Sequence, residues 1–198
     1  MNISITKGKT YSEVLRWEQE TYVYVPITAI SKVNGSPAIT ATAHGAPDGW
    51  RVVVTGVKGM TDINCQNWPP KDSDWKKATK IDANTVELNS LNAADFKDYT
   101  SGGFLIYRAP VDLTGFTARM TIKDKVGGTV LETLTTAGGE IVINTTDYTI
   151  TRTLDAATTA AYTFKKGVYD MEMVSPDATP VVSEYDSGAV VVEEEVTT

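Results

Sequence analysis

A chain of 198 residues can build one large β-domain or two small ones, and a hydrophobic content of 41% is that of a globular protein. The formal net charge of −7, without any block of lysine or arginine, argues against nucleic-acid binding, and the single cysteine, Cys65, excludes an intrachain disulfide. No window approaches about 18 apolar residues and the first ten residues lack the apolar core of a signal peptide, so we expect no membrane span and synthesis in a cytoplasm.

The first third of the chain reads as strands separated by turns. Residues 38–44 (AITATAH) read as a strand that ends at His44, the only histidine. The PDG sequence that follows is typical of a tight turn, because its glycine tolerates a positive φ. We expect the His44 ring to bond the backbone of this turn, and Trp50, which opens the next strand with three valines behind it, to lie in the core.

The longest strand-poor stretch is residues 63–77, INCQNWPPKDSDWKK. Its Pro-Pro pair and its Asp/Ser run argue against both a helix and a central strand. Trp68 and Trp75 flank the most polar part of this loop. Exposed aromatic side chains often mark interfaces, so these two are our candidates for partner contact; the alternative is packing within the base of the loop.

The second half of the chain alternates more regularly. In residues 116–124, Phe116, Ala118, Met120 and Ile122 fall on one face of an expected half-buried strand. Further expected strands, separated by glycine-rich turns, lie at 132–136, 140–144, 147–154, 167–175 and 188–196. Asp155 is an expected N-cap of a short helix at 155–162, and residues 92–96 are a second candidate for one turn. The pattern predicts an all-β protein with one or two short helical turns.

The chain is poor in residues that carry chemistry. A catalytic triad or a Cys-His pair would have to use His44, and one histidine with one cysteine cannot by themselves form a zinc site. Asp72 and Asp74 could touch a cation, but such surface pairs are more often solvated. We therefore predict no enzyme, and no catalytic, cofactor-binding or metal-binding residues.

Two parts of the sequence resemble known families. The segment HGAPDGWRVVVTGVKGMTDIN, followed by IDANTVELN, is similar to the small β-barrel called the first catalytic cysteine half domain in ubiquitin-activating enzymes, a module also found in phage virion proteins. The resemblance is carried by His44-Gly45, Gly49, Val57, Gly59-Met60 and Ile63-Asn64. It implies a barrel and gives no reason to expect ubiquitin chemistry.

The second resemblance begins with PVDLTGFTARMTIKD and continues to GAVVVEEEVT near the end of the chain. It is to the N-terminal immunoglobulin-like domain of phage baseplate upper proteins. In that family a strand like KGKTYSEVLRW, residues 7–17, directly precedes the DLTG strand, whereas here about a hundred residues separate the two. The resemblance implies a discontinuous immunoglobulin-like β-sandwich of residues 1–26 and 109–198, with a small β-barrel of residues 27–108 inserted into it.

These resemblances imply a non-enzymatic structural protein of a tailed-phage virion, assembled in the bacterial cytoplasm and located in the tail. It would be a tail-tip or baseplate protein, or an adaptor to fibres or spikes, and its partners would be other virion proteins. Symmetric assembly as a homo-oligomer, with a trimer favoured, would multiply weak contacts. Two alternatives remain: a capsid decoration protein, and a carbohydrate-binding module that contacts host polysaccharide through Trp68 and Trp75.

Overall fold

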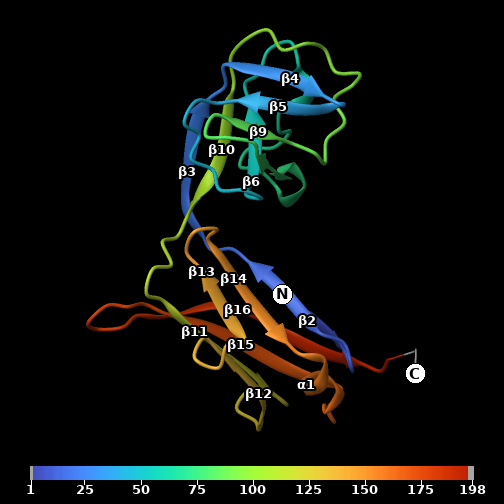
Figure 1. Ribbon diagram of the computed structural model, residues 1–198, viewed down its shortest axis with the longest axis vertical. Coiled ribbons are helices and arrows are strands. Elements are labelled where there is room, and N and C mark those ends of the chain that lie inside the picture. The colour runs from blue at the N-terminus through green and yellow to red at the C-terminus, as the bar shows by residue number, and fades with distance from the viewer. Residues whose placement is uncertain (1, 196–198) are drawn as a thin grey trace. The chain divides into compact units, whose positions relative to one another are not determined.

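The computed structural model describes residues 2–195, which form an all-β protein with one short α-helix and two 3-10 turns (Figure 1). The chain divides into two compact units: residues 2–17 with 112–195, and residues 18–111 between them. The expected boundaries, after residue 26 and before residue 109, differ from these. They differ because residues 18–26 pair with residues 104–110 and so belong to the second unit. Residues 1 and 196–198 of the expected first unit lie outside the described residues.

The first unit consists of two sheets. The larger has the strand order β1-β16-β15-β11-β12 and the smaller the order β13-β14-β2. The strands are β1 (Ile3–Thr6), β2 (Tyr11–Leu15), β11 (Thr117–Lys123), β12 (Val130–Thr135), β13 (Ile141–Asn144), β14 (Thr149–Leu154), β15 (Lys166–Val174) and β16 (Val182–Glu193). β1 runs parallel to β16, so strands from both ends of the sequence hold this unit together.

The alternation expected along β11 is confirmed, because Ala118, Met120 and Ile122 are buried while Phe116 just before it is half-buried. The last strand differs from the expectation of residues 188–196. β16 begins earlier, at Val182, since its pairing with β15 continues through a bulge to the pair Val174–Val182. Residue 196 lies outside the described residues.

The short helix is α1 (Ala156–Ala160), and Asp155 is its N-cap as expected. The Asp155 carboxylate accepts a hydrogen bond of 2.6 Å from the backbone N–H of Thr158, which lowers the pKa of this carboxyl group. Residues 92–96 form a hydrogen-bonded turn rather than a helix, with the Phe96 N–H donating to the Ala93 carbonyl. Against expectation, the polar loop contains a 3-10 turn, η2 (Asp72–Asp74). Another 3-10 turn, η1 (Thr61–Ile63), ends where the loop begins.

A buried ion-pair network joins the two sheets of the first unit. Arg152 of β14 is 0% exposed, and its guanidinium donates to the Glu13 carboxylate at 2.6 and 2.9 Å. It also lies 3.0 Å from the Asp186 carboxylate and 5.0 Å from the ring centroid of Tyr169. Burial and the hydrogen bond to Asp186 raise the pKa of Tyr169 to about 12. A buried charge is tolerated only with such partners, so the network fixes how the two sheets pack.

The second unit consists of two four-stranded sheets, β3-β10-β6-β7 and β4-β5-β9-β8. Its strands are β3 (Glu18–Pro26), β4 (Ala29–Val33), β5 (Ser36–Thr40), β6 (Arg51–Thr55), β7 (Lys76–Lys77), β8 (Thr79–Lys80), β9 (Thr85–Glu87) and β10 (Phe104–Pro110). The chain passes directly from one sheet into the other at Ala78, between β7 and β8, and at Ile27–Thr28, between β3 and β4. Backbone hydrogen bonds continue around both corners, and the strand order therefore closes into a small barrel.

The residues around the PDG turn, His44 and Trp50, are buried in the barrel and hydrogen-bonded to its backbone. His44 is buried; its Nδ1 accepts from the Ala46 N–H at 3.1 Å, and its Nε2 lies 3.0 Å from the Asp82 carbonyl. Both ring nitrogens thus have backbone partners, as expected for a structural histidine. Trp50 is fully buried and donates its indole N–H to the Arg108 carbonyl at 2.7 Å, which confirms its place in the core.

Candidate binding surface

The two tryptophans predicted from the sequence come together on the outside of the barrel. The Trp68 ring lies 5.5 Å from the ring of Tyr22, and the Trp75 ring lies 6.3 Å from it in a stacked arrangement. Tyr22 belongs to β3, which was expected in the first unit but lies in the second. The polar loop therefore folds back over β3 instead of extending into solvent.

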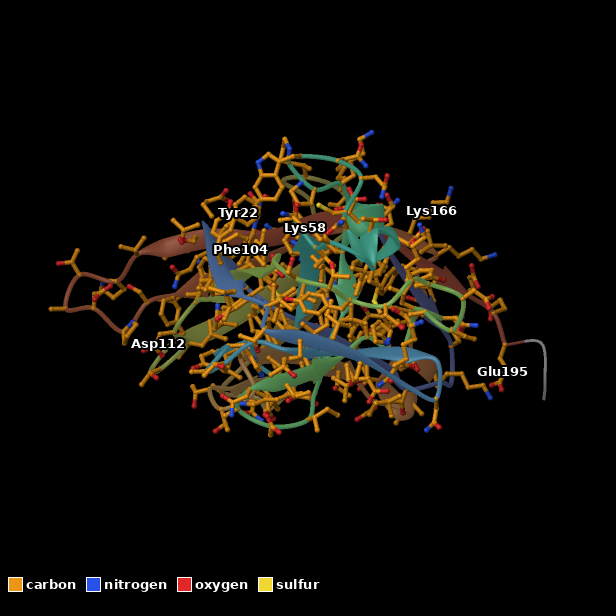
Figure 2. All side chains as sticks on the ribbon, turned by 90° about the horizontal axis from the view of Figure 1, so that it is seen from above. Tyr22, Lys58, Phe104, Asp112, Lys166 and Glu195 are labelled. Atoms are coloured by element: carbon orange, nitrogen blue, oxygen red, sulfur yellow. The ribbon has the colours of Figure 1, made fainter. Side chains whose placement is uncertain are left out.

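Two strands supply the rest of this surface. Tyr22 and Tyr24 lie two residues apart on β3, so their side chains point to the same face. Phe104, at the start of β10, packs edge-on against Tyr24 with 6.2 Å between ring centroids. Figure 2 labels Tyr22 and Phe104, which lie on the same side of the barrel. We call the five rings the aromatic surface: Tyr22, Tyr24, Trp68, Trp75 and Phe104.

Exposure separates the two predicted tryptophans. The exposed fractions of Trp68, Tyr24 and Phe104 are 54%, 50% and 42%, whereas Trp75 is half-buried. Such a group of exposed rings is larger than the isolated apolar residues that are normal on a protein surface. Trp68 is thus available to a ligand or partner, and Trp75 supports the rings around it.

Cations hold the supporting part of the surface in place. The Arg51 guanidinium lies 5.0 Å from the ring centroid of Trp75 and donates to the Glu18 carboxylate at 2.6 and 2.7 Å. The hydrogen bond with Glu18 raises the pKa of Arg51. Arg108 lies 5.2 Å from the ring centroid of Tyr22. These cation–π contacts restrain Tyr22 and Trp75, because the face of each ring attracts the positive charge of the guanidinium above it.

Asp74 organises the loop that carries Trp68. Its carboxylate accepts from the backbone N–H of Lys71 at 2.9 Å, from the Asn67 amide at 3.0 Å and from the backbone N–H of Gln66 at 3.4 Å. The hydrogen bonds from Lys71 and Asn67 lower the pKa of Asp74. The Cys65 N–H also donates to the Val54 carbonyl of β6 at 2.7 Å. Trp68 is therefore presented from a loop that is hydrogen-bonded on both sides.

A depression of about 300 Å³ lies beside Trp68. Its walls are formed by Tyr24 and Trp68, and the remaining lining residues are Thr55, Cys65, Gln66 and Asn67. Burial, followed by the neighbouring Asp74 charge, raises the pKa of the Cys65 thiol. Cys65 is thus a neutral part of the lining near pH 7 and not an activated thiolate.

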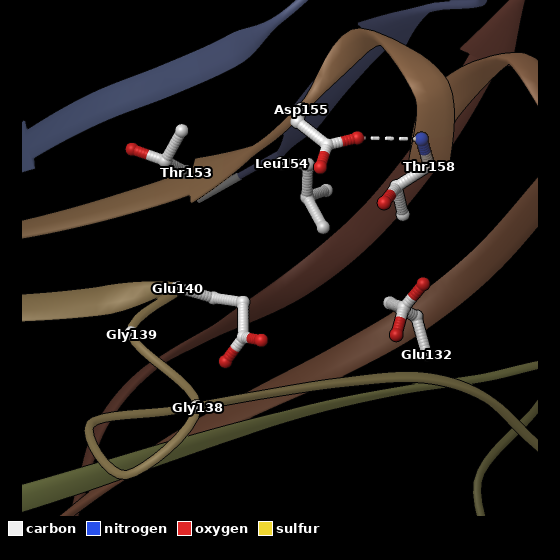
Figure 3. A pocket seen from close by; sticks show the side chains of 8 residues that line it. All are labelled: Glu132, Gly138, Gly139, Glu140, Thr153, Leu154, Asp155 and Thr158. Atoms are coloured by element: carbon white, nitrogen blue, oxygen red, sulfur yellow. Dashed lines mark hydrogen bonds between the residues drawn. The ribbon is translucent and has the colours of Figure 1, made fainter.

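The first unit has a different, acidic depression of about 350 Å³, lined by Glu132, Glu140 and Asp155 among others (Figure 3). Asp155 caps α1, Glu140 accepts from the Thr135 N–H at 3.1 Å, and Glu132 accepts from the Tyr162 hydroxyl at 3.3 Å. Within residues 2–195, no group of three or more histidine, cysteine or acidic residues is arranged to hold a metal ion. The carboxylates in Figure 3 thus have structural hydrogen bonds.

No known protein family and no curated protein matches this chain. None of the helices in the described part of the chain is long and apolar enough to cross a membrane. Of the five rings, Trp68 and Trp75 are predicted from the sequence, whereas Tyr22, Tyr24 and Phe104 are not. The two tyrosines could have been predicted to lie together, because the alternation YVYV at residues 22–25 places both on one face of a strand.

Proposed function

We propose that the chain is a non-enzymatic structural component of a tailed-phage virion: a tail-tip or baseplate protein, or an adaptor to fibres or spikes. The proposal starts from the two resemblances in the sequence, and one structural observation carries it further. A complete barrel, residues 18–111, is inserted between β2 and β11 of the first unit, whose terminal strands β1 and β16 pair with each other. An insertion of this kind adds a binding module to an assembly module without disturbing the strands of either.

The outer face of the smaller sheet in the first unit offers a contact for assembly. Val14 of β2 and Val142 of β13 both pair with Thr151 of β14, so the three side chains form one row across the sheet. The buried residues of β14 alternate with Thr151, so this row faces away from the core. Val14 and Val142 are both exposed. A row of valines on two edge strands suits a contact with a second copy, and a homo-oligomer such as a trimer would repeat it.

Electron microscopy with a gold-labelled antibody against this chain tests the proposal on purified phage particles. Label at the tail tip supports the tail protein. Label over the head indicates a capsid decoration protein instead, which has the same class of fold. Absence of the chain from purified particles, measured by mass spectrometry, would refute a virion role altogether.

A further inference from the structure

We propose that the depression lined by Tyr24 and Trp68 binds a sugar residue of an uncharged polysaccharide. The inference rests on the proposed function in one respect: a virion protein meets the polysaccharides of a host surface. Three features of the molecule support the site: the lining of the depression, its size and the loop that presents Trp68.

The lining selects the chemistry of the ligand. Tyr24, Thr55, Cys65, Gln66, Asn67 and Trp68 include no carboxylate, ammonium or guanidinium group. An ionic ligand would find no counter-charge in the depression, and its desolvation would cost free energy that nothing offsets. The Gln66 and Asn67 amides each donate one hydrogen bond within the protein, to the Asn64 carbonyl and the Asp74 carboxylate. A wholly apolar ligand would cover the rest of both amides without offering them hydrogen bonds. The lining therefore suits a neutral molecule that has both an apolar face and hydroxyl groups.

A pyranose ring has this combination of properties. Its axial C–H groups form an apolar face that can lie on an aromatic ring, and its equatorial hydroxyls point sideways toward amide and hydroxyl groups. Trp68 and Tyr24 supply two rings whose centroids are 6.2 Å apart, with an angle of 46° between their planes. Because the rings are inclined and pack on each other, a sugar would lie against their adjoining faces and not between them. A depression of about 300 Å³ is at the small end of ligand sites, as a single sugar residue requires.

The site is ordered before any ligand binds. The Trp68 ring packs on Tyr22 and Tyr24, and the loop behind it is tied by Asp74 and by the Cys65–Val54 backbone hydrogen bond. Aromatic side chains have few rotatable bonds, so little conformational entropy is lost when such rings bind a ligand. Repeated copies in an assembly would raise a weak affinity by avidity.

The test uses the full-length protein labelled with ¹⁵N and follows the indole N–H signals of its four tryptophans by NMR. The Trp68 signal is assigned with the Trp68→Phe variant. The probes are oligosaccharides of glucose, galactose, mannose and N-acetylglucosamine, each titrated to about 10 mM, a range that detects millimolar dissociation constants. We expect at least one neutral oligosaccharide to move the Trp68 signal in a saturable way, while the buried Trp50 signal stays in place.

Variants identify the depression as the site. Trp68→Ala and Tyr24→Ala should each weaken binding by about tenfold or more, because each removes one aromatic wall. Ile81→Ala is the control, since Ile81 is an exposed apolar side chain of the same unit that neither belongs to the aromatic surface nor lines the depression. It should change the dissociation constant by less than about twofold.

Several results would overturn the inference. One is the absence of a saturable shift with any neutral oligosaccharide, and another is a stronger shift with oligomers of uronic acid. A third is an equal loss of binding in Ile81→Ala, and the last is a Trp68 signal that responds only to protein concentration. The last would indicate a second copy as the occupant. The proposed function fails separately: sugar binding by a protein that is absent from particles refutes the virion role, and a tail-tip protein that binds no sugar refutes only this inference.

Discussion

Replacing Arg152 by alanine should destabilise the first unit more than any other single change of charge in it. The guanidinium is 0% exposed and is paired with Glu13 and Asp186, which come from different strands. Removing it leaves two carboxylates facing each other without a cation. Losing one partner of a buried ion pair costs about 3–5 kcal/mol in the free energy of unfolding. For a unit of about 100 residues, that corresponds to a fall in Tm of at least about 12 °C.

The assay is thermal and urea unfolding followed by near-ultraviolet circular dichroism. Trp17 fluorescence is a local probe in a background where phenylalanine, which keeps most of the buried volume, replaces the other three tryptophans. Trp17 packs on Phe116 and Tyr185 within the first unit, so its signal follows this unit alone. Arg119→Ala is the matched control. Arg119 pairs with Glu172 in the same unit, but its side chain is 59% exposed, and an exposed pair contributes less than about 1 kcal/mol.

A loss of less than about 1 kcal/mol in Arg152→Ala, equal to that of the control, would refute the reasoning about the buried network. The triple variant Arg152→Met, Glu13→Gln, Asp186→Asn gives a second check. It removes all three charges at once, so it should be more stable than Arg152→Ala, because no unpaired buried charge remains.

Three further predictions concern the barrel and the assembly. Trp50→Ala should lower the free energy of unfolding by about 3–5 kcal/mol, since it empties the barrel core, whereas Trp68→Ala should change it by less than about 1 kcal/mol; urea unfolding of both variants tests this difference. The pKa of Asp74 is lower in the folded protein than its usual value of 3.8, so the loop is stabilised above that pH and should loosen as the pH falls below it. Tryptophan fluorescence between pH 2 and 6 measures this change, and an equal response in Asp74→Asn would contradict it. Val142→Asp should reduce self-association in sedimentation experiments while Val191→Asp, an exposed valine of β16, does not; equal effects would exclude the Val14–Val142 row as the contact.

Local sequence patterns predicted some strands and the helix cap correctly, but the strand expected at residues 38–44 begins at Ser36 and ends at Thr40, before His44. The alternation in β11 identified the three side chains that are buried, and Asp155 was recognisable as an N-cap from its position before an alanine-rich segment. The pattern failed where strands continue through irregular pairing. β16 begins at Val182, and the residues that extend it are recognisable as strand only because β15 continues beside them through a bulge.

The aromatic surface also depends on contacts between distant segments that local patterns do not reveal. Trp68 and Trp75 were conspicuous in the sequence because they are aromatic residues in a polar loop. Their separation into an exposed ring and a supporting ring depends on Arg51, Glu18 and Tyr22, which lie on other strands. No pattern within the loop contains that information.

The all-β class, the buried face of the regularly alternating strands, the helix cap and the structural role of the only histidine could all be predicted from short stretches of sequence. These features depend on residues a few positions apart, whose spacing decides which face or turn they can form. Three features could not be predicted in this way: β3 belongs to the barrel, β1 pairs with β16, and Trp68 and Tyr24 line one depression. Those contacts join residues far apart in the chain, and their geometry exists only once the sheets have closed.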